Sequence, residues 1–126
     1  QVVGSTAYVT LFESERGPAS LVAVDLTDPT RTRLAGRTYF DATWATGLHV
    51  VGNTALVTAV QRGDSGDGLG LLVAIDVSNR NDLRVVSTLA TGSRFHLGLD
   101  RVGDLVYLAD YDLGLMIARL TSPRIP

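Results

Sequence analysis

The sequence predicts an all-β fold, a segment of a β-propeller with two to three four-stranded antiparallel blades that form an incomplete ring. Short apolar runs alternate with polar turns along the whole chain, and no stretch carries the 3.6-residue apolar period of a helix. A strand–turn motif recurs three times. Its anchor glycines, Gly4, Gly52 and Gly103, are 48 and then 51 residues apart, a spacing typical of propeller blades.

The first element of each repeat is a glycine turn followed by an alternating strand. The segments VGSTAYVT, VGNTALVT and VGDLVYLA, at residues 3–10, 51–58 and 102–109, align on this pattern. A Gly-Asn or Gly-Asp pair suits a hairpin turn that needs a positive φ. We therefore predict a tight hairpin turn at each anchor glycine.

The second element is a nearly continuous apolar run, found at residues 21–27, 72–78 and 115–121. Successive Val, Ile and Leu residues indicate strands buried on both faces. The third copy aligns with a shift of about one position. The third element, at residues 33–40 and 83–90, is interrupted by polar residues, which is typical of an edge strand with one solvated face.

The fourth element precedes an anchor glycine, at residues 47–51 and 97–102. Gly47 and Gly98 have the same offset in the two copies, and glycine inside a strand often marks the close approach of another backbone. These strands are expected to converge on the propeller axis. We therefore expect a close backbone approach at both glycines.

The chain is expected to form one unit, residues 1–126, from approximate repeats at 1–46, 47–96 and 97–126. Propeller rings have about four to eight blades. Fewer than three blades leave unpaired sheet edges, which proteins usually cover. We expect a protein partner or a second copy to complete the propeller, and two chains with six blades are the simplest closed arrangement.

The composition excludes several classes of function. The chain is 45% hydrophobic and 19% charged, as in ordinary globular domains, and its net charge of −2 argues against nucleic-acid binding. Without cysteine there are no disulfides, thiolate zinc sites or cysteine nucleophiles. No apolar run approaches the roughly 20 residues needed to span a bilayer. The sequence contains no glycine-rich phosphate-binding loop, so we expect no cofactor.

Two motifs resemble the LVIVD repeat, a β-propeller blade found mostly in bacterial and archaeal surface or secreted proteins. The resemblance is strongest in VGDLVYLAD at 102–110 and GLMI at 114–117, and the runs at 21–29 and 72–78 are similar to the motif that names the repeat. The resemblance implies propeller blades and a place outside the cell or at its surface, and it implies no shared chemistry. Arg119 departs from the pattern, because the repeat usually has Asp there.

Polar side chains at strand ends are candidates for a binding site at the mouth of the propeller channel. His49 and Asp100 share one register on successive inner strands, and Asp110 and Tyr111 follow the best repeat match. Titratable groups often gather in such openings, yet Asp at turns is more often an acceptor for backbone N–H groups, and we favour that role. His96 is out of register with His49, so a two-histidine metal site is not expected.

A site in the glycine-rich loop is a weaker alternative. Asp64 and Asp67, together with Asp112, offer carboxylates for Ca²⁺, which takes about six to eight oxygen ligands. The loop lacks the spacing of an EF-hand, so we favour a solvated loop and expect no metal. The segment GDSG at 63–66 resembles the nucleophile segment of trypsin-like proteases, but no His and Asp are suitably placed in the sequence, so we expect no catalytic residue.

The leading hypothesis for function is a non-catalytic scaffold or recognition module for protein partners. Length variation between repeats concentrates in one loop, at residues 13–20, 61–70 and 110–114, and such insertions fall on one face of a repeat protein. Two alternatives stay open: a ligand-binding or enzymatic propeller with a polar site at the channel mouth, and a carbohydrate-binding propeller. The carbohydrate alternative rests on aromatic residues between repeats, for which we favour packing between blades: Tyr39, Phe40, Trp44 and Phe95.

Overall fold

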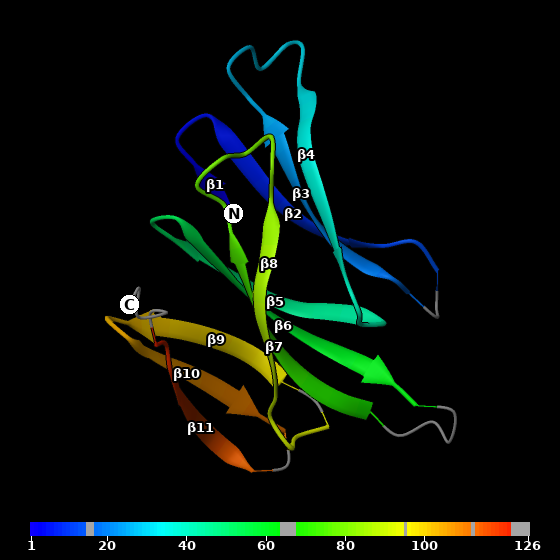
Figure 1. The fold of residues 1–126 in the computed structure, drawn as a ribbon, viewed down its shortest axis with the longest axis vertical. Coiled ribbons are helices and arrows are strands. Elements are labelled where there is room, and N and C mark those ends of the chain that lie inside the picture. Colours follow the sequence, from blue (N-terminus) through cyan, green and yellow to red (C-terminus); the bar gives the residue numbers. More distant parts are fainter. Residues whose placement is uncertain (15–16, 64–67, 95, 112, 122–126) are drawn as a thin grey trace, which may run out of the picture.

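The computed structural model describes residues 1–14, 17–63, 68–94, 96–111 and 113–121. This part of the chain holds 11 strands and no helix, and the strands form three antiparallel sheets, none of which closes into a barrel (Figure 1). The all-β, blade-like fold class is thereby confirmed. Within the same residues, no helix has the length and apolar character needed to cross a membrane.

The three sheets follow one another along the chain, and we call them blades 1, 2 and 3. Blade 1 contains β1 (Val2–Val3), β2 (Thr6–Phe12), β3 (Ala19–Asp25) and β4 (Arg33–Phe40). Blade 2 contains β5 (Trp44–Val51), β6 (Thr54–Arg62), β7 (Gly68–Asp76) and β8 (Arg84–Ala90). Blade 3 contains β9 (His96–Val102), β10 (Leu105–Asp110) and β11 (Gly114–Arg119). Within each blade the strands are neighbours in chain order.

The anchor glycines form the predicted hairpin turns. Gly4, Gly52 and Gly103 have φ values of 59°, 58° and 58°, a region that other residues rarely adopt. Each lies in a two-residue turn, because the flanking residues pair directly, as Val51 does with Thr54. The turns therefore set the same register at the start of every blade.

That register corrects the alignment of the third repeat. Thr6 pairs with Asp25 in blade 1, and Thr54 pairs with Asp76 in blade 2. Their counterpart in blade 3 is Leu105, which pairs with Arg119. The expected shift of one position is wrong, since the short turn before β11 keeps the pairing in step. Arg119 therefore occupies the position that Asp holds in the other two blades.

The central strands of blade 2, β6 and β7, are buried on both faces, as the continuous apolar run predicts for β7. Alternate residues of β6, such as Ala55 and Val57, join the core between blades 1 and 2, and Leu56 between them joins the core between blades 2 and 3. The equivalent prediction for β11 is wrong. Leu115 and Ile117 are exposed because no described sheet covers that side of blade 3.

The outer strands and the long loops also differ from expectation. β4 has the expected mixture of exposed and half-buried residues, but every residue of β8 is exposed. The loops are shorter than expected, because strand pairing continues to Phe12–Ala19 in blade 1 and to Arg62–Gly68 in blade 2.

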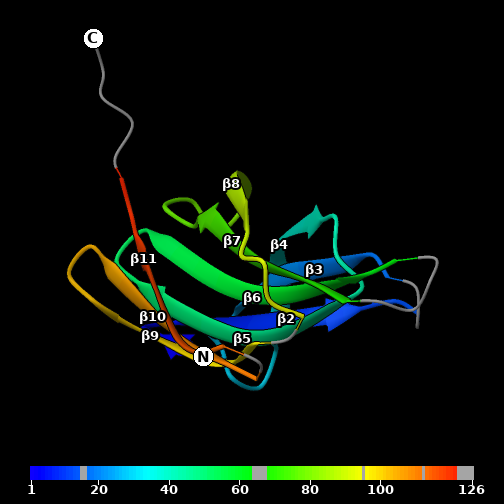
Figure 2. The same cartoon turned by 90° about the horizontal axis from the view of Figure 1, so that it is seen from below.

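β5, the first strand of blade 2, lies against strands of both neighbouring blades. β5 contacts β2 on one side and β9 on the other, and Figure 2 shows these strands side by side. A Cβ on Gly47 would lie 2.7 Å from Thr58 Oγ1, 2.9 Å from Leu99 Cδ2 and 4.0 Å from Gly98 Cα. A Cβ on Gly98 would meet nothing within 4 Å. Gly47 is therefore closely packed, but against the side chains of Thr58 and Leu99 and not against another backbone, and the added methyl group at Gly98 has no close neighbour.

Replacing Gly47 with alanine is expected to lower the free energy of unfolding by about 1–2 kcal/mol, as overpacking does in a filled interface. Thr58 is fully buried and its hydroxyl oxygen accepts a hydrogen bond from Thr46 at 3.0 Å, so it has little freedom to move aside. Urea denaturation followed by the fluorescence of Trp44 measures the change.

The matched control is Gly98→Ala, at the equivalent position of the next inner strand. Because the added methyl group meets open space, stability should change by less than about 0.5 kcal/mol. Equal losses in the two variants would contradict the account of inter-blade packing.

Candidate functional site

Three polar residues occupy equivalent positions at the inner edge of the blades, two of them in β5 and β9 and one directly before β1. Gln1, His49 and Asp100 each lie opposite the third residue of the following strand, β2, β6 or β10. They form a row across the inner edge of the three blades, which we call the inner polar row. The sequence predicted the shared register of His49 and Asp100, and only the structure adds Gln1.

Gln1 and His49 each lie close to a residue of the next blade in the chain. The Gln1 side-chain amide donates to the Val50 carbonyl at 2.9 Å and accepts from the Val50 N–H at 2.8 Å. His49 Nε2 lies 4.0 Å from Asp100 Oδ1, too far for a hydrogen bond but close enough for attraction when the imidazole is protonated. The Asp100 carboxylate also accepts the Arg101 N–H at 2.8 Å.

Asp110 lies in a different place from His49 and Asp100. It pairs with His96, which precedes Asp100 by four residues of β9, a span of about 13 Å. Both side chains of this pair have 0% relative exposure, and His96 Nδ1 lies 3.8 Å from Asp110 Oδ2. Asp110 Oδ1 accepts the Leu113 N–H at 3.0 Å. The structure therefore separates the residues predicted for the channel mouth. His49 and Asp100 form an accessible pair, whereas Asp110 forms a buried pair with His96.

The buried pair belongs to a cluster that joins blade 2 to blade 3. His96 Nε2 lies 2.6 Å from Thr91 Oγ1, and the Thr91 hydroxyl is also 3.2 Å from the Gly70 carbonyl oxygen in β7. Gly70 also exchanges backbone hydrogen bonds with Thr91 and Ser93. A Cβ on Gly70 would lie 2.9 Å from Ser93 O and 3.2 Å from His96 Nε2, so this site requires glycine.

The Thr91 hydroxyl has one proton, and both the Gly70 carbonyl oxygen and His96 Nε2 can accept it. When it donates to Gly70, the hydroxyl accepts from Nε2–H instead. When the Thr91 hydroxyl donates to Nε2, the proton on Nδ1 points toward the Asp110 carboxylate, which is the electrostatically favourable arrangement. No described group hydrogen-bonds to Nδ1. Carboxylate, imidazole and hydroxyl follow the order of a nucleophilic triad. Full burial of His96 and Asp110 leaves no access for a substrate, so the arrangement supports a structural role.

The remaining predicted site residues do not join either pair. Tyr111 is 74% exposed in the turn after β10. Asp64 and Asp67 lie outside the described residues, as do Asp112 and Phe95. Among the residues that are described, no group of three or more His, Asp or Glu side chains is placed to hold a metal ion.

The aromatic side chains are divided between packing and the surface. Phe40 is buried in the core between blades 1 and 2, and Trp44 is half-buried at the start of β5. Tyr39 is exposed and donates its hydroxyl to Glu13 at 2.8 Å, beneath the guanidinium of Arg37 at 5.6 Å from the ring centre.

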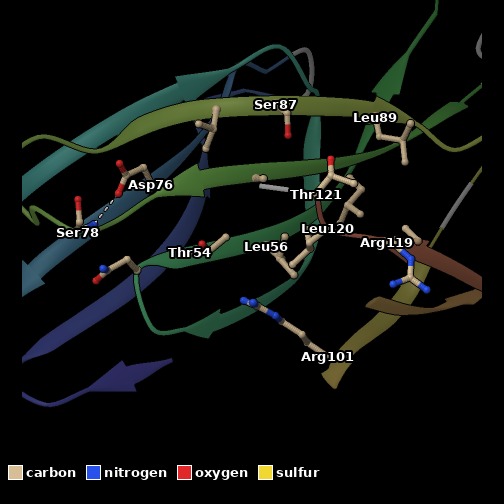
Figure 3. Close-up of a pocket in the computed structure, with 15 residues that line it drawn as sticks. Thr54, Leu56, Asp76, Ser78, Ser87, Leu89, Arg101, Arg119, Leu120 and Thr121 are labelled. Atoms are coloured by element: carbon tan, nitrogen blue, oxygen red, sulfur yellow. Dashed lines mark hydrogen bonds between the residues drawn. The ribbon is translucent and has the colours of Figure 1, made fainter. Parts of the chain in front are cut away.

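A cleft of about 710 Å³ lies between blades 2 and 3 (Figure 3). Its apolar lining includes Leu56 and Leu72 of blade 2, and its polar lining includes Asp76, Arg101 and Arg119. Sequence reasoning missed this cleft. The available signal was the departure at Arg119.

Comparison with known proteins adds no relative. No protein-family model matches the chain, and no curated protein or solved structure matches it either.

The buried imidazole predicts a loss of stability in acid. Burial lowers the pKa of His96 below its usual value of 6.5, and the opposing effect of Asp110 is smaller. Once the pH falls below that value, the unfolded chain binds more protons than the folded chain, so the free energy of unfolding decreases. Urea denaturation in a series from about pH 7 to about pH 5 measures this decrease.

The variant His96→Gln should lose the part of the decrease that His96 causes and show a flatter pH profile. A second variant, His96→Asn, separates this effect from a packing defect peculiar to Gln. If both variants keep the pH profile of the parent chain, burial of His96 does not control acid stability.

Proposed function

We propose that this chain is a non-catalytic propeller segment that serves as a scaffold or recognition module, with its two end faces bound to further blades. The observation that carries the proposal is that positions in the same strand register are buried in blade 2 and exposed at the two ends of the chain's three blades. Blade 2 packs on both neighbours through alternate side chains of its two central strands. Several of the same positions on the outward faces of blades 1 and 3 carry exposed apolar side chains, although Val22 of blade 1 is buried.

The outward face of blade 3 repeats the blade 2 face that blade 3 covers. Leu115 and Ile117 correspond in strand register to Leu72 and Ala74, which are buried, yet they are 63% and 57% exposed. The outward face of blade 1 repeats the other blade 2 face. Val9 there corresponds to the buried Val57 and is 39% exposed.

Burial of these faces is favourable. A fully buried Leu, Ile or Val side chain contributes about 1.5–3 kcal/mol, and each face holds several such residues. The two faces are different surfaces of one repeat, so contact between them is head-to-tail and closes into a ring when the rotation per blade allows it. A longer chain or a second copy supplies the further blades, and two copies with six blades remain the simplest ring.

The hairpin loops are the surface that we assign to recognition. The ends of β2, β6 and β10 lead into loops at the same side of the three blades (Figure 1). A rigid sheet scaffold that displays loops at one end is a common arrangement for protein recognition. The resemblance to LVIVD-repeat proteins supports a place outside the cell or at its surface, and we include this location in the proposal.

One observation favours the alternative of a ligand-binding or enzymatic site. His49 and Asp100 lie close together at the inner edge of the blades, and both are accessible. A metal or activity that is lost in His49→Ala would support this alternative over the scaffold.

The chain is expected to self-associate through its end faces, with a dimer as the principal species. Ile117→Asp on blade 3 and Leu11→Asp on blade 1 each place a charge on one face and should weaken association by about tenfold or more. Analytical ultracentrifugation over a concentration series measures the association constant.

Tyr111→Asp is the matched control, because this exposed residue lies in the turn after β10 and in no strand of either end face. It should leave association unchanged. The proposal is wrong if the parent chain is a monomer at every concentration, or if its mass is unaffected by both face variants.

A further inference from the structure

The turn between β7 and β8 links blade 2 to blade 1 through one arginine. Arg80 Nη2 lies 3.1 Å from Asp25 Oδ2, at the end of β3. Its Nη1 donates to the Ser5 carbonyl oxygen at 3.3 Å and to the Thr6 hydroxyl at 3.2 Å. A Cβ on Gly36 of β4 would clash with the Arg80 carbonyl oxygen, so the turn also packs closely on blade 1. This turn therefore contributes both packing and an ion pair to the contact between the two blades.

The receiving positions on blade 3 carry different charges. The hairpin turns and the strand register make Asp104 and Arg119 the counterparts of Ser5 and Asp25. An arginine that approached blade 3 as Arg80 approaches blade 1 would meet the guanidinium of Arg119. Like charges brought together at an interface are unfavourable, so the outward face of blade 3 selects against a turn of the β7–β8 type.

The turn between β3 and β4 in blade 1 lacks that arginine. The ranges 25–33 and 76–84 are equivalent, because the residues at their two ends pair with each other in each blade, so the two turns have the same length. By position, Pro29 replaces the arginine. Asp28 and Arg31, on either side of it, are both exposed. Blade 1 therefore presents a turn that has no positive charge at the position that would face Arg119.

The charges of this turn are opposite to those on blade 3. Asp28 Oδ1 accepts the N–H and the hydroxyl of Thr30, at 3.0 and 2.7 Å, which holds the carboxylate in place. Arg119 lies 4.0 Å from Asp104, and both side chains are largely exposed, so this ion pair contributes little and Arg119 is able to bind a second carboxylate. Arg31 on the turn is opposite in sign to Asp104. Each charge on the turn thus has an opposite charge on blade 3.

We propose that the outward face of blade 3 binds blade 1 of a second copy of this chain, with Asp28 of the second copy paired to Arg119. The β3–β4 turn of the second copy then lies on blade 3 as the β7–β8 turn lies on blade 1, and the ion pair has reversed polarity. This inference rests on the proposed function and deepens it, because it names the partner and the charge pair that selects it. The reversed pair distinguishes the contact between copies from the contact between blades of one copy.

The test exchanges the two charges in the full chain. Arg119→Asp and Asp28→Arg each place like charges at the contact. Each variant should weaken self-association by about tenfold, because an exposed ion pair becomes a repulsion and a closed dimer contains the contact twice. Analytical ultracentrifugation over a concentration series measures the association constants.

A mixture of the two variants separates a specific pair from a general effect of charge. In a mixed dimer, both contacts regain one Asp and one Arg, so the mixed dimer should form with about the affinity of the parent chain. Native mass spectrometry distinguishes the mixed dimer from the two homodimers by mass. Arg62→Asp is the matched control, because it changes the net charge as Arg119→Asp does and lies exposed at the end of β6 in blade 2. It should leave association unchanged.

The inference and the proposed function fail in different ways. If Ile117→Asp weakens association but neither charge variant does, the end faces associate without an ion pair between Asp28 and Arg119, and only the inference is overturned. A mixture that associates no better than each variant alone also overturns the inference. A parent chain that is monomeric at every concentration overturns both.

Discussion

The structure depends on the burial of both faces of blade 2. In β6 and β7 apolar side chains alternate strictly between the blade 1 and blade 3 sides, so that each strand contributes to two cores. A sheet of this kind is stable only between two others, because either exposed face would leave Val, Ile and Leu side chains in water. Blades 1 and 3 therefore pack on the two faces of blade 2. Each has one face covered by blade 2 and one face directed away from it.

The same requirement explains where polar groups are tolerated. At the inner edge, the strands are close enough for Gln1 to bond with the backbone of β5 and for His49 to approach Asp100. Between blades 2 and 3, His96 is accommodated only because Gly70 has no side chain and Thr91 offers a hydroxyl. Polar contacts thus link successive blades at positions where the apolar cores end.

Blade 3 differs from blades 1 and 2 in three features among the described residues. Blade 3 has three described strands, its outward face is apolar, and the charge at the end of β11 is opposite to that of its counterparts. The exposure of the apolar face follows from the lack of a described sheet against it. The third is a property of blade 3 itself and distinguishes it from a simple copy of blades 1 and 2.

The sequence by itself determined the local elements: the hairpin turns at Gly4, Gly52 and Gly103, the strands that follow them and the shared register of His49 and Asp100. These depend on backbone preferences and on a period of two, which a single strand already contains. Only the tertiary structure decided that Asp110 joins His96, that Gly47 but not Gly98 is closely packed, and that a cleft lies beside Arg119. Each of these depends on which blade lies next to which, and side chains distant in sequence meet only after the sheets have packed.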